Sequence, residues 1–424
     1  MKVLVIGSGG REMSLVAHLA QRHQVYCAGR SDAIAQIATM LDVPDLPAPQ
    51  CWEELADVAL AEGIELTIVG PEGPLSSGVV DVFTERGLRI FGPTAAAAQI
   101  ESSKSFAKDV MEAAGVPTAA YRYFTDPSAV AAYLDTDIAY PVVLKEDGLR
   151  AGKGVTICAT REDAHETLSG LVVDDANPLL VEEFLEGFEF SLIVLANGTE
   201  VIALPVAQDH KPIGEGNTGP NTGGMGAVTP VPRVTPELVE ETMTRVIGPT
   251  LAEMVARGNT FTGFLYAGLI ATAGGVKVIE FNARLGDPEA EVLLPRLEGD
   301  LGAAASALLD GTDYQLEISP DTVVGTVLSS PGYPGTVTAS PDIPQALFDA
   351  IAGDQNAGII HMGTQRYTDE QGNKKWRANG GRVAIVTMRG DSIASCQQKI
   401  IGLLADTLGE SELYYRRDIG AFAG

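Results

Sequence analysis

The first hundred residues alternate short apolar runs with helical patterns, and this alternation constrains the fold more than any other feature. Residues 2–6 predict a strand, a glycine turn follows at residues 7–12, and an apolar-periodic helix then extends to about Ala20. The later members of the pattern are strands at residues 66–69 and 88–91 and a helix at residues 76–86. Strands alternating with helices indicate a Rossmann-like parallel α/β domain whose ligand loops lie at the carboxyl ends of the strands.

The glycine turn GSGGRE at residues 7–12 is typical of an anion-binding corner. Small residues allow a ligand to approach closely, and the N–H groups that begin the helix point at it. A dinucleotide site would need a further spaced glycine and an acidic residue closing the second strand, which here ends in CAGR at residues 27–30. The turn therefore favours a phosphate or phosphoribosyl group over NAD.

The formal net charge of −27 argues against a nucleic-acid or anionic-membrane partner, because polyanions require a concentrated basic surface. A small phosphorylated ligand needs only a local basic pocket. The four cysteines are scattered without C-x-x-C spacing, which predicts a reduced compartment with no disulfide framework and no zinc cluster. No apolar run approaches the ~18 residues that span a bilayer, and we expect a soluble, cytoplasmic protein.

A second α/β region begins with a predicted helix at residues 102–114. This helix carries Lys104 and Lys108 one turn apart, which by default form a solvated face.

A glycine-rich hairpin connects two predicted strands at residues 142–144 and 155–159. The first strand ends in Lys145, and the hairpin reads EDGLRAGKG at residues 146–154. This arrangement is typical of a flexible flap that closes over phosphates, with Lys145 and Lys153 neutralising the charge of a triphosphate. The P-loop pattern itself is absent.

Two later segments are candidate ligand loops. Residues 179–189, LLVEEFLEGFE, predict a strand that ends in a hinge crowded with carboxylates, which is either a charged loop or an adenine slot. Residues 214–226, GEGNTGPNTGGMG, form a long loop of small residues that suits an anionic or amino-acid ligand. His210 before it is a candidate general base, although a lone histidine is more often structural.

The segment VKVIEFNARLGDPE at residues 276–289 is the candidate metal site. Residues 261–271 and 276–281 predict an antiparallel pair, which would place Glu280 and Asn282 centrally and on one face. A carboxylate and an amide oxygen on one face suit Mg²⁺, with Mn²⁺ as the alternative ion. The competing interpretation is an edge strand with solvated polar residues.

The pattern changes near residue 321 and predicts a small C-terminal α+β domain. Its predicted strands are residues 322–328, 358–361 and 383–387, and its predicted helices are residues 343–351 and 392–406. Two further helices are predicted before it, at residues 235–257 and 300–309. The turn NGGR at residues 379–382 is either a hairpin corner or a ligand contact. We predict domains at residues 1–101, 102–320 and 321–424, with a small lobe at about residues 120–188.

The motifs in their order resemble the phosphoribosylamine–glycine ligase family, also called glycinamide ribonucleotide synthetases. The matching segments are VLVIGSGGRE, TIVGPEGPL, DGLRAGKGV, VEEFL, QDHK, GPNTGGMGA, VIEFNARLGDPE, NGGRV and RRDIG. The resemblance implies an ATP-grasp core of two α+β lobes with ATP between them. It also implies that the glycine carboxylate attacks the γ-phosphate, and that the amine of phosphoribosylamine then displaces phosphate from the glycyl phosphate.

The matching motifs imply roles for individual residues. Mg²⁺ would bind at Glu280 and Asn282, while Arg284, Asp287 and Lys211 would be catalytic, the first two beside the acyl phosphate and the amino acid. ATP would contact Lys104, Lys145, Gly152, Lys153, Gly154, Glu182, Glu183, Leu185 and Glu189. The other substrates would contact Gly9, Gly10, Arg11, Glu12, Asp209, Asn221, Thr222 and Gly223.

The chain departs from the family pattern near the expected amine site and flap. Met13 stands where the family usually has histidine, the loop at residues 29–34 lacks the usual P-G-N-x-G, and Glu146 and Arg150 occupy two alanine positions. A related ligase with the same chemistry and another amine or amino acid therefore remains an alternative, as does a catalytically silent nucleotide-binding protein. Intact Lys145, Glu280 and Asn282 argue against the silent protein. We expect a monomer or weak homodimer that acts on small molecules.

Overall fold

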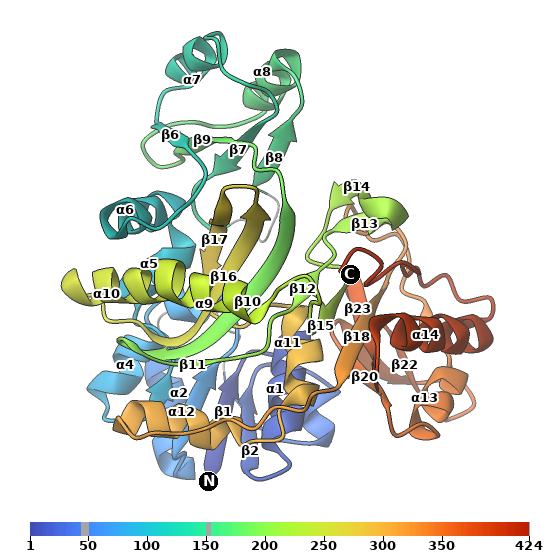
Figure 1. Ribbon diagram of the computed structural model, residues 1–424. Coiled ribbons are helices and arrows are strands. Elements are labelled where there is room, and N and C mark those ends of the chain that lie inside the picture. Colours follow the sequence, from blue (N-terminus) through green and yellow to red (C-terminus); the bar gives the residue numbers. More distant parts are fainter. Residues whose placement is uncertain (44–50, 150–153, 424) are drawn as a thin grey trace.

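The N-terminal segment forms a parallel sheet with strand order β3-β2-β1-β4-β5, as predicted. The computed structural model describes residues 1–43, 51–149 and 154–423 (Figure 1). The strands are β1 (Lys2–Ile6), β2 (Gln24–Ala28), β3 (Thr39–Met40), β4 (Leu66–Val69) and β5 (Ile90–Phe91). The helices are α1 (Gly10–Leu19), η1 (Ile34–Gln36), α2 (Cys51–Glu62), α3 (Glu72–Ser76), α4 (Val79–Glu85) and α5 (Ala95–Ser102). Four consecutive residues of β1 are fully buried, because helices cover both faces of a parallel sheet.

Two helical predictions in this domain were incomplete. The helix predicted at residues 76–86 is divided into α3 and α4, because Gly78 between them has a φ of +89°. Helix α2 was not predicted, although its buried Trp52, Leu55, Ala56 and Ala59 have helical spacing.

The small lobe is an antiparallel sheet with strand order β6-β9-β7-β8. Its elements are β6 (Tyr121–Phe124), α7 (Pro127–Leu134), β7 (Val142–Glu146), β8 (Val155–Cys158), α8 (Arg161–Ser169) and β9 (Leu179–Glu183). Helix α6 (Lys104–Ala114) leads into it and begins at Ser103, whose hydroxyl accepts a hydrogen bond from the Phe106 N–H. The helix predicted at 102–114 thus starts two residues later, since Ser102 ends α5.

The central lobe is an antiparallel sheet with strand order β11-β10-β16-β17. Its strands are β10 (Phe188–Asn197), β11 (Glu200–Ala203), β16 (Thr262–Thr272) and β17 (Gly275–Asn282). The helices beside it are α9 (Pro236–Thr242), a π-helical turn η3 (Met243–Ile247), α10 (Gly248–Ala256), α11 (Glu289–Leu293), η4 (Leu294–Arg296) and α12 (Leu301–Asp310). The predicted antiparallel pair is confirmed as β16 and β17, and β17, which carries Glu280 and Asn282, is at the edge of this sheet.

The C-terminal sheet has strand order β12-β15-β18-β23-β20 and takes strands from both sides of residue 320. Its strands are β12 (Gln208–Asp209), β15 (Gly226–Thr229), β18 (Thr322–Ser329), β20 (Ala357–His361) and β23 (Arg382–Gly390). Smaller elements are β13 (Pro212–Gly214), η2 (Glu215–Asn217), β14 (Thr218–Asn221), β19 (Asp342–Ile343), β21 (Thr364–Thr368), β22 (Lys374–Ala378), α13 (Gln345–Ala352) and α14 (Ile393–Leu408). The predicted fold class, a multidomain α/β and α+β protein, is confirmed.

The parts meet around the central lobe. In Figure 1 the small lobe stands above the central sheet, the N-terminal domain lies below it, and the C-terminal domain lies beside it. One apolar cluster joins N-terminal residues such as Leu4 and Phe83 to central-lobe residues such as Leu265, and the rings of Phe91 and Phe264 meet edge to face at 5.2 Å. None of the helices in the described ranges is long and apolar enough to cross a membrane.

Candidate active site

A cavity of about 310 Å³, the main cavity, lies where the N-terminal domain, both lobes and the C-terminal domain meet. Most of its polar lining comes from the predicted site. The charged and amide residues that line it are Arg11, Glu72, Glu101, Lys104, Lys108, Lys145, Glu182, Asp209, Lys211, Glu280, Asn282, Arg284, Asp287, Glu289 and Arg382. Tertiary folding thus gathers charged groups of both signs from the whole length of the chain.

A β-bulge aims Glu280 and Asn282 into the main cavity. Gly268 of β16 pairs with Glu280 while its neighbour Leu269 pairs with Val278, so Ile279 is an extra residue in β17. Val278 before the bulge and Phe281 after it both lie in the apolar core. Strict alternation would have put Glu280 on the core face with Val278, and the bulge reverses this.

The surroundings of Glu280 fit a divalent cation. Burial raises the pKa of Glu280, but Lys211, Lys145 and Arg284 outweigh it and hold the pKa below its ordinary value. No group in the described ranges donates a hydrogen bond to its carboxylate. Asn282 Oδ1, two residues along, accepts from Arg284 Nη2 at 3.2 Å. An ionised carboxylate without a protein donor, beside an amide oxygen, is a donor set that suits a hard cation such as Mg²⁺.

The lysines of α6 and β7 converge on one buried carboxylate. Glu182 Oε1 lies 3.0 Å from Lys108 Nζ, and Glu182 Oε2 lies 2.7 Å from Lys145 Nζ. All three side chains are almost fully buried. The interpretation of Lys108 as part of a solvated face was therefore wrong, because α6 presents it to the small lobe. Lys104, one turn earlier, is partly buried and donates to the Gly148 carbonyl at 2.9 Å.

A second cavity of about 170 Å³, the slot, lies between the two lobes. Its walls are largely apolar and include Val143, Ile157, Phe184, Leu185, Ile270 and Ile279. Its polar lining residues are Lys145, Glu182, Glu183, Glu189, Lys211, Asn221, Thr222 and Glu280. Because Lys145, Lys211 and Glu280 line both cavities, the slot lies beside Glu280, the candidate metal ligand.

The carboxylates of the slot differ in what holds them. Glu183 Oε1 accepts from Lys277 Nζ at 2.8 Å and from the Ala120 N–H at 3.0 Å, and these bonds lower the pKa of Glu183. Glu189 is exposed, and its Oε2 lies 3.5 Å from Lys211 Nζ. Of the predicted flap, Gly154 lines the main cavity, whereas Gly152 and Lys153 lie outside the described residues.

Asp209 raises the pKa of two other residues of the main cavity, Lys211 and Glu289. Asp209, whose Oδ2 lies 3.9 Å from Lys211 Nζ, raises the pKa of Lys211 well above its ordinary value despite burial. Lys211 therefore stays an ammonium group. Burial and the nearby Asp209 raise the pKa of Glu289 to about 7, and its Oε1 accepts from Ser191 Oγ and Tyr266 Oη, both at 3.0 Å.

Two arginines tie the loop after β17 to other domains. Arg284 Nη2 lies 2.9 Å from Glu101 Oε1, and Arg284 Nε lies 3.3 Å from Glu72 Oε2. Arg382 Nη1 lies 2.9 Å from Asp287 Oδ1 and also donates to the Gly223 carbonyl at 2.7 Å. The turn at residues 379–382 therefore supplies a cavity residue.

A third cavity of about 850 Å³, the N-terminal cavity, lies at the carboxyl ends of the parallel strands. The glycine turn and the loop after β2 line it, through residues that include Gly7, Gly9, Glu12, Arg30 and Asp32. Glu12 closes the turn: its Oε2 accepts from the Gly9 N–H at 2.6 Å, and its Oε1 accepts from Arg11 Nε at 2.7 Å.

Gly10 is buried, and a Cβ there would lie 2.5 Å from Glu291 Oε1. Of the lining residues described, Gly10 belongs to none of the three cavities.

The departures from the family pattern have distinct environments. Met13 packs, partly buried, against the apolar cluster around α1 and lines none of the three cavities. Asp32, in the altered loop, lines the N-terminal cavity, and its Oδ2 accepts from the Arg366 N–H at 2.8 Å. The altered loop is thereby tied to the C-terminal domain. Glu146 ends β7, and Arg150 lies outside the described residues.

His210 occupies a structural position. It is buried, its Nε2 accepts from the Gly420 N–H at 3.0 Å, and burial lowers its pKa to about 4. The proton of the neutral ring is therefore on Nδ1. His210 lines none of the three cavities, so the structure favours the structural interpretation over a general base.

Several cavity residues were absent from the predicted set. Glu72, Glu101, Tyr266 and Arg382 line the main cavity. Glu72 follows a strand end in GPEGP and Arg382 ends the NGGR turn, and both signals were visible in the sequence. Glu101 and Tyr266 lie inside a helix and a strand, where nothing local marks them as cavity residues.

Comparison with known proteins covers the whole chain. Models of the phosphoribosylglycinamide synthetase N domain, ATP-grasp (A) domain and C domain match residues 1–101, 102–290 and 323–422. The phosphoribosylamine–glycine ligase of Escherichia coli (strain K12) is 43% identical over 437 residues, covering 99% of this chain and 98% of that protein. The enzyme of the same name from Halalkalibacterium halodurans is 40% identical over 431 residues, covering 100% and 97%. The crystal structure of the Thermotoga maritima phosphoribosylamine–glycine ligase is 28% identical, with a TM-score of 0.80 and coverage of 99% and 100%.

Proposed function

This chain belongs to the phosphoribosylglycinamide synthetase family and is an ATP-dependent ligase that joins 5-phosphoribosylamine to glycine, and we propose that the reaction takes place in the main cavity. The product is glycinamide ribonucleotide, an intermediate of purine biosynthesis. The single observation that carries the proposed site is the meeting of cations, carboxylates and the Glu280–Asn282 pair in one cavity between the domains.

The slot suits the adenine ring and the main cavity suits the phosphates. Apolar side chains such as Ile157 and Ile270 would enclose the base, and Lys104 and Lys145 would face the phosphate chain. Lys145 is already held by Glu182 and by the Ile279 carbonyl at 3.1 Å, so its ammonium group is oriented before ATP arrives. Preorganised charge of this kind stabilises a phosphoryl transfer without a covalent nucleophile.

Glu280 and Asn282 would hold the divalent metal that the ATP-grasp domain uses, and we assign Mg²⁺, with Mn²⁺ as the alternative. The metal supplies charge neutralisation on the phosphate oxygens. Lys211 and Arg284 remain cationic and would orient the glycine carboxylate and the acyl phosphate, while Asp287 would face the amino acid. The glycine carboxylate would attack the γ-phosphate of ATP, giving glycyl phosphate and releasing ADP. The amine of phosphoribosylamine, held by the glycine turn, would then attack the carbonyl carbon of glycyl phosphate and displace phosphate to form the amide.

The wider assignments follow from the same proposal. We divide the chain into residues 1–101, 102–320 and 321–424, with ATP bound in the middle region. The protein acts on small molecules as a monomer or weak homodimer. A cytoplasmic location agrees with its four free cysteines.

The test is ADP release by the purified protein with ATP, Mg²⁺ and glycine, with and without freshly generated phosphoribosylamine. We expect turnover that depends on phosphoribosylamine, with glycinamide ribonucleotide detected by mass spectrometry. A reaction without Mg²⁺, in excess chelator, is the control. Turnover that occurs only with another amine or amino acid would instead identify a related ligase whose altered loop at residues 29–34 accepts a different substrate.

A further inference from the structure

The hairpin of β13 and β14 carries cavity residues at its base. Lys211 precedes β13, Asn221 ends β14 and Thr222 follows it. The Thr222 N–H and hydroxyl both donate to the Lys211 carbonyl, at 2.8 Å and 2.7 Å. These three residues line the slot, and Lys211 and Thr222 also line the main cavity.

The hairpin cannot order itself by its own packing. Its two strands pair only with each other among the strands of the described chain, and none of their residues is buried. An isolated two-stranded hairpin is marginally stable in water. Some other part of the molecule must therefore hold it.

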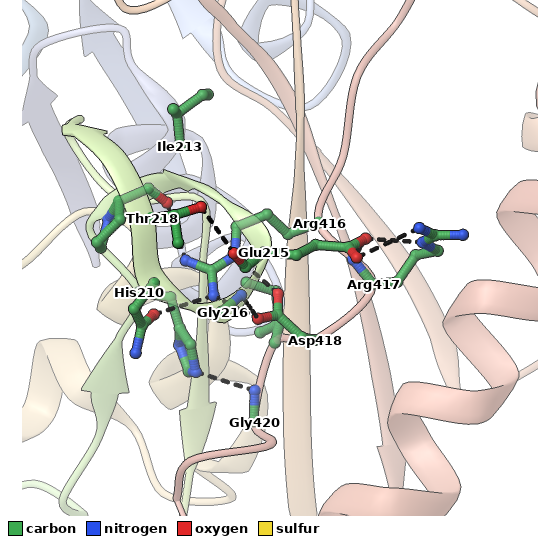
Figure 2. A network of polar contacts seen from close by, with 12 residues as sticks. His210, Ile213, Glu215, Gly216, Thr218, Arg416, Arg417, Asp418 and Gly420 are labelled. Atoms are coloured by element: carbon green, nitrogen blue, oxygen red, sulfur yellow. Dashed lines mark hydrogen bonds and ion pairs between the residues drawn. The ribbon is translucent and has the colours of Figure 1, made fainter.

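An ion pair between a buried arginine and a partly exposed aspartate of the C-terminal segment holds the hairpin (Figure 2). The Arg416 side chain is fully buried, and its Nε and Nη2 lie 2.8 Å from Asp418 Oδ1 and Oδ2. Arg416 Nη1 donates to the Pro212 carbonyl at 2.8 Å, and its Nη2 donates to Asn217 Oδ1 at 3.0 Å. Asp418 Oδ2 also accepts from the Gly216 N–H at 2.7 Å. The Arg416 guanidinium thus contacts both the base and the tip of the hairpin, and the Asp418 carboxylate contacts the tip.

Further contacts lie at the edge of this network. Arg417, whose side chain is 65% exposed, pairs with Glu215 at 2.7 Å (Figure 2). An exposed pair of this kind contributes little, because water competes for both charges. Tyr414 Oη donates to the Ile213 carbonyl at 3.0 Å, and the Gly420 N–H reaches His210 Nε2.

We propose that Arg416 and Asp418 are positioning residues for the reaction: they hold the β13–β14 hairpin so that Lys211, Asn221 and Thr222 form a fixed wall for nucleotide and glycine. Arg416 and Asp418 therefore act on the active site without touching substrate. This inference rests on the proposed function of the two cavities. It predicts that loosening the hairpin weakens ATP and glycine binding and leaves the phosphoribosylamine site at the glycine turn unaffected.

Two substitutions weaken the contacts between Arg416 and the hairpin, and a substitution at the adjacent residue serves as the control. Arg416→Lys keeps the charge but loses the paired geometry of the guanidinium. Asn217→Gly removes only the Oδ1 acceptor at the tip, and glycine tolerates the φ of +56° at this position. Arg417→Ala, one residue away on the same segment, is the matched control.

The measurements are the KM values of the three substrates, kcat, and the affinity for MgADP by calorimetry, at a temperature where each variant is folded by circular dichroism. For Arg416→Lys and Asn217→Gly we expect the KM values of ATP and glycine, and the Kd of MgADP, to rise about tenfold, because small displacements of positioning groups are costly. The KM of phosphoribosylamine in these variants, and every constant of Arg417→Ala, should stay within about twofold, as for a surface change.

A lower melting temperature with unchanged constants would overturn the inference, as would an equal change in all three KM values. If Arg416→Lys does not fold, the constants of Asn217→Gly alone test the inference. If the wild-type protein shows no turnover with phosphoribosylamine, the proposed function fails, while MgADP affinity still tests the hairpin.

Discussion

Burial and neighbouring charges shift the pKa values of two carboxylates in one cavity in opposite directions. Lys211 and Lys145 outweigh burial at Glu280, whose pKa is lowered, so this residue is ionised. Burial and Asp209 raise the pKa of Glu289 to about 7, and neutral hydroxyls donate to it. Residue type alone therefore does not determine the role of a carboxylate here.

Replacing Glu280 with alanine tests the metal assignment. We expect the rate of ADP release to fall at least about a thousandfold at saturating Mg²⁺, since the metal would lose its strand carboxylate. The fold should persist, because no group in the described chain donates a hydrogen bond to Glu280. Glu200→Ala, at an exposed carboxylate on β11 of the same sheet, is the control and should retain normal activity. Near-normal turnover in Glu280→Ala would remove Glu280 from the metal site.

Glu289 should make stability depend on pH. Its pKa is about 7 in the folded protein and near its ordinary value of 4.5 in the unfolded chain. Between these pH values the folded state binds more protons, so the free energy of unfolding falls as pH rises from about 4.5 to about 7. Glu289→Gln lacks this titration. The free energy of unfolding of this variant, measured in urea at pH 5, 6, 7 and 8, should therefore increase relative to that of the wild type as pH rises. Parallel profiles for the two proteins would contradict the assignment.

Among the elements, turns with unusual backbone geometry place the loops that carry the site. Gly224 has a φ of +112°, and a Cβ there would lie 2.3 Å from Pro288 Cδ. The loop that contains Gly223 can therefore pack against the segment after β17 only if residue 224 is glycine. Arg382 then joins the two segments through the Gly223 carbonyl and Asp287.

Gly224→Ala should separate these loops. We expect kcat/KM to fall at least about tenfold and the free energy of unfolding to fall by about 1–3 kcal/mol, from left-handed strain and the clash with Pro288. Steady-state kinetics and urea unfolding measure the two effects. Unchanged kinetics would show that the loop tolerates the displacement.

The matched control is Gly402→Ala in the middle of α14. Gly402 is exposed, and a Cβ there would meet nothing within 4 Å. Alanine should raise the free energy of unfolding by about 0.5–1 kcal/mol, because glycine loses more backbone entropy in a helix. Its activity should equal that of the wild type.

At the scale of the whole molecule, the domains share both a sheet and an apolar core. Strand β15, which follows the hairpin loop, pairs with β18 of the C-terminal domain. Met225 and Val228 belong to the apolar cluster that contains Val324 and Leu404. The C-terminal domain therefore completes a sheet that begins in the central region.

A chain truncated after residue 320 should fail to form the active site. It would lose β18 and the segment around Arg416, which leaves β15 unpaired on one edge and the hairpin without its anchor. We expect aggregation and no ADP release, whereas the complete chain should unfold in a single calorimetric transition. A soluble, active truncated protein would contradict this view of the C-terminal domain.

The sequence predicted elements best where local periodicity is strong. The strands at residues 2–6 and 66–69 and the helix at 300–309 came from apolar spacing that one element suffices to define. The burial of Lys108 could not be predicted, since it depends on Glu182, which lies on another element. The contribution of Arg382 to the cavity likewise depends on the packing of distant loops.

The sequence by itself determined the family, the order of the domains and the kinds of groups available to the site, because motifs and periodicity are properties of neighbouring residues. The tertiary structure decided which way those groups face. Alternation along β17 puts Glu280 with Val278, and only the bulge opposite Gly268 turns it from the core to the cavity. A bulge arises from the pairing of two strands, and hence from contacts that a single segment of sequence does not contain.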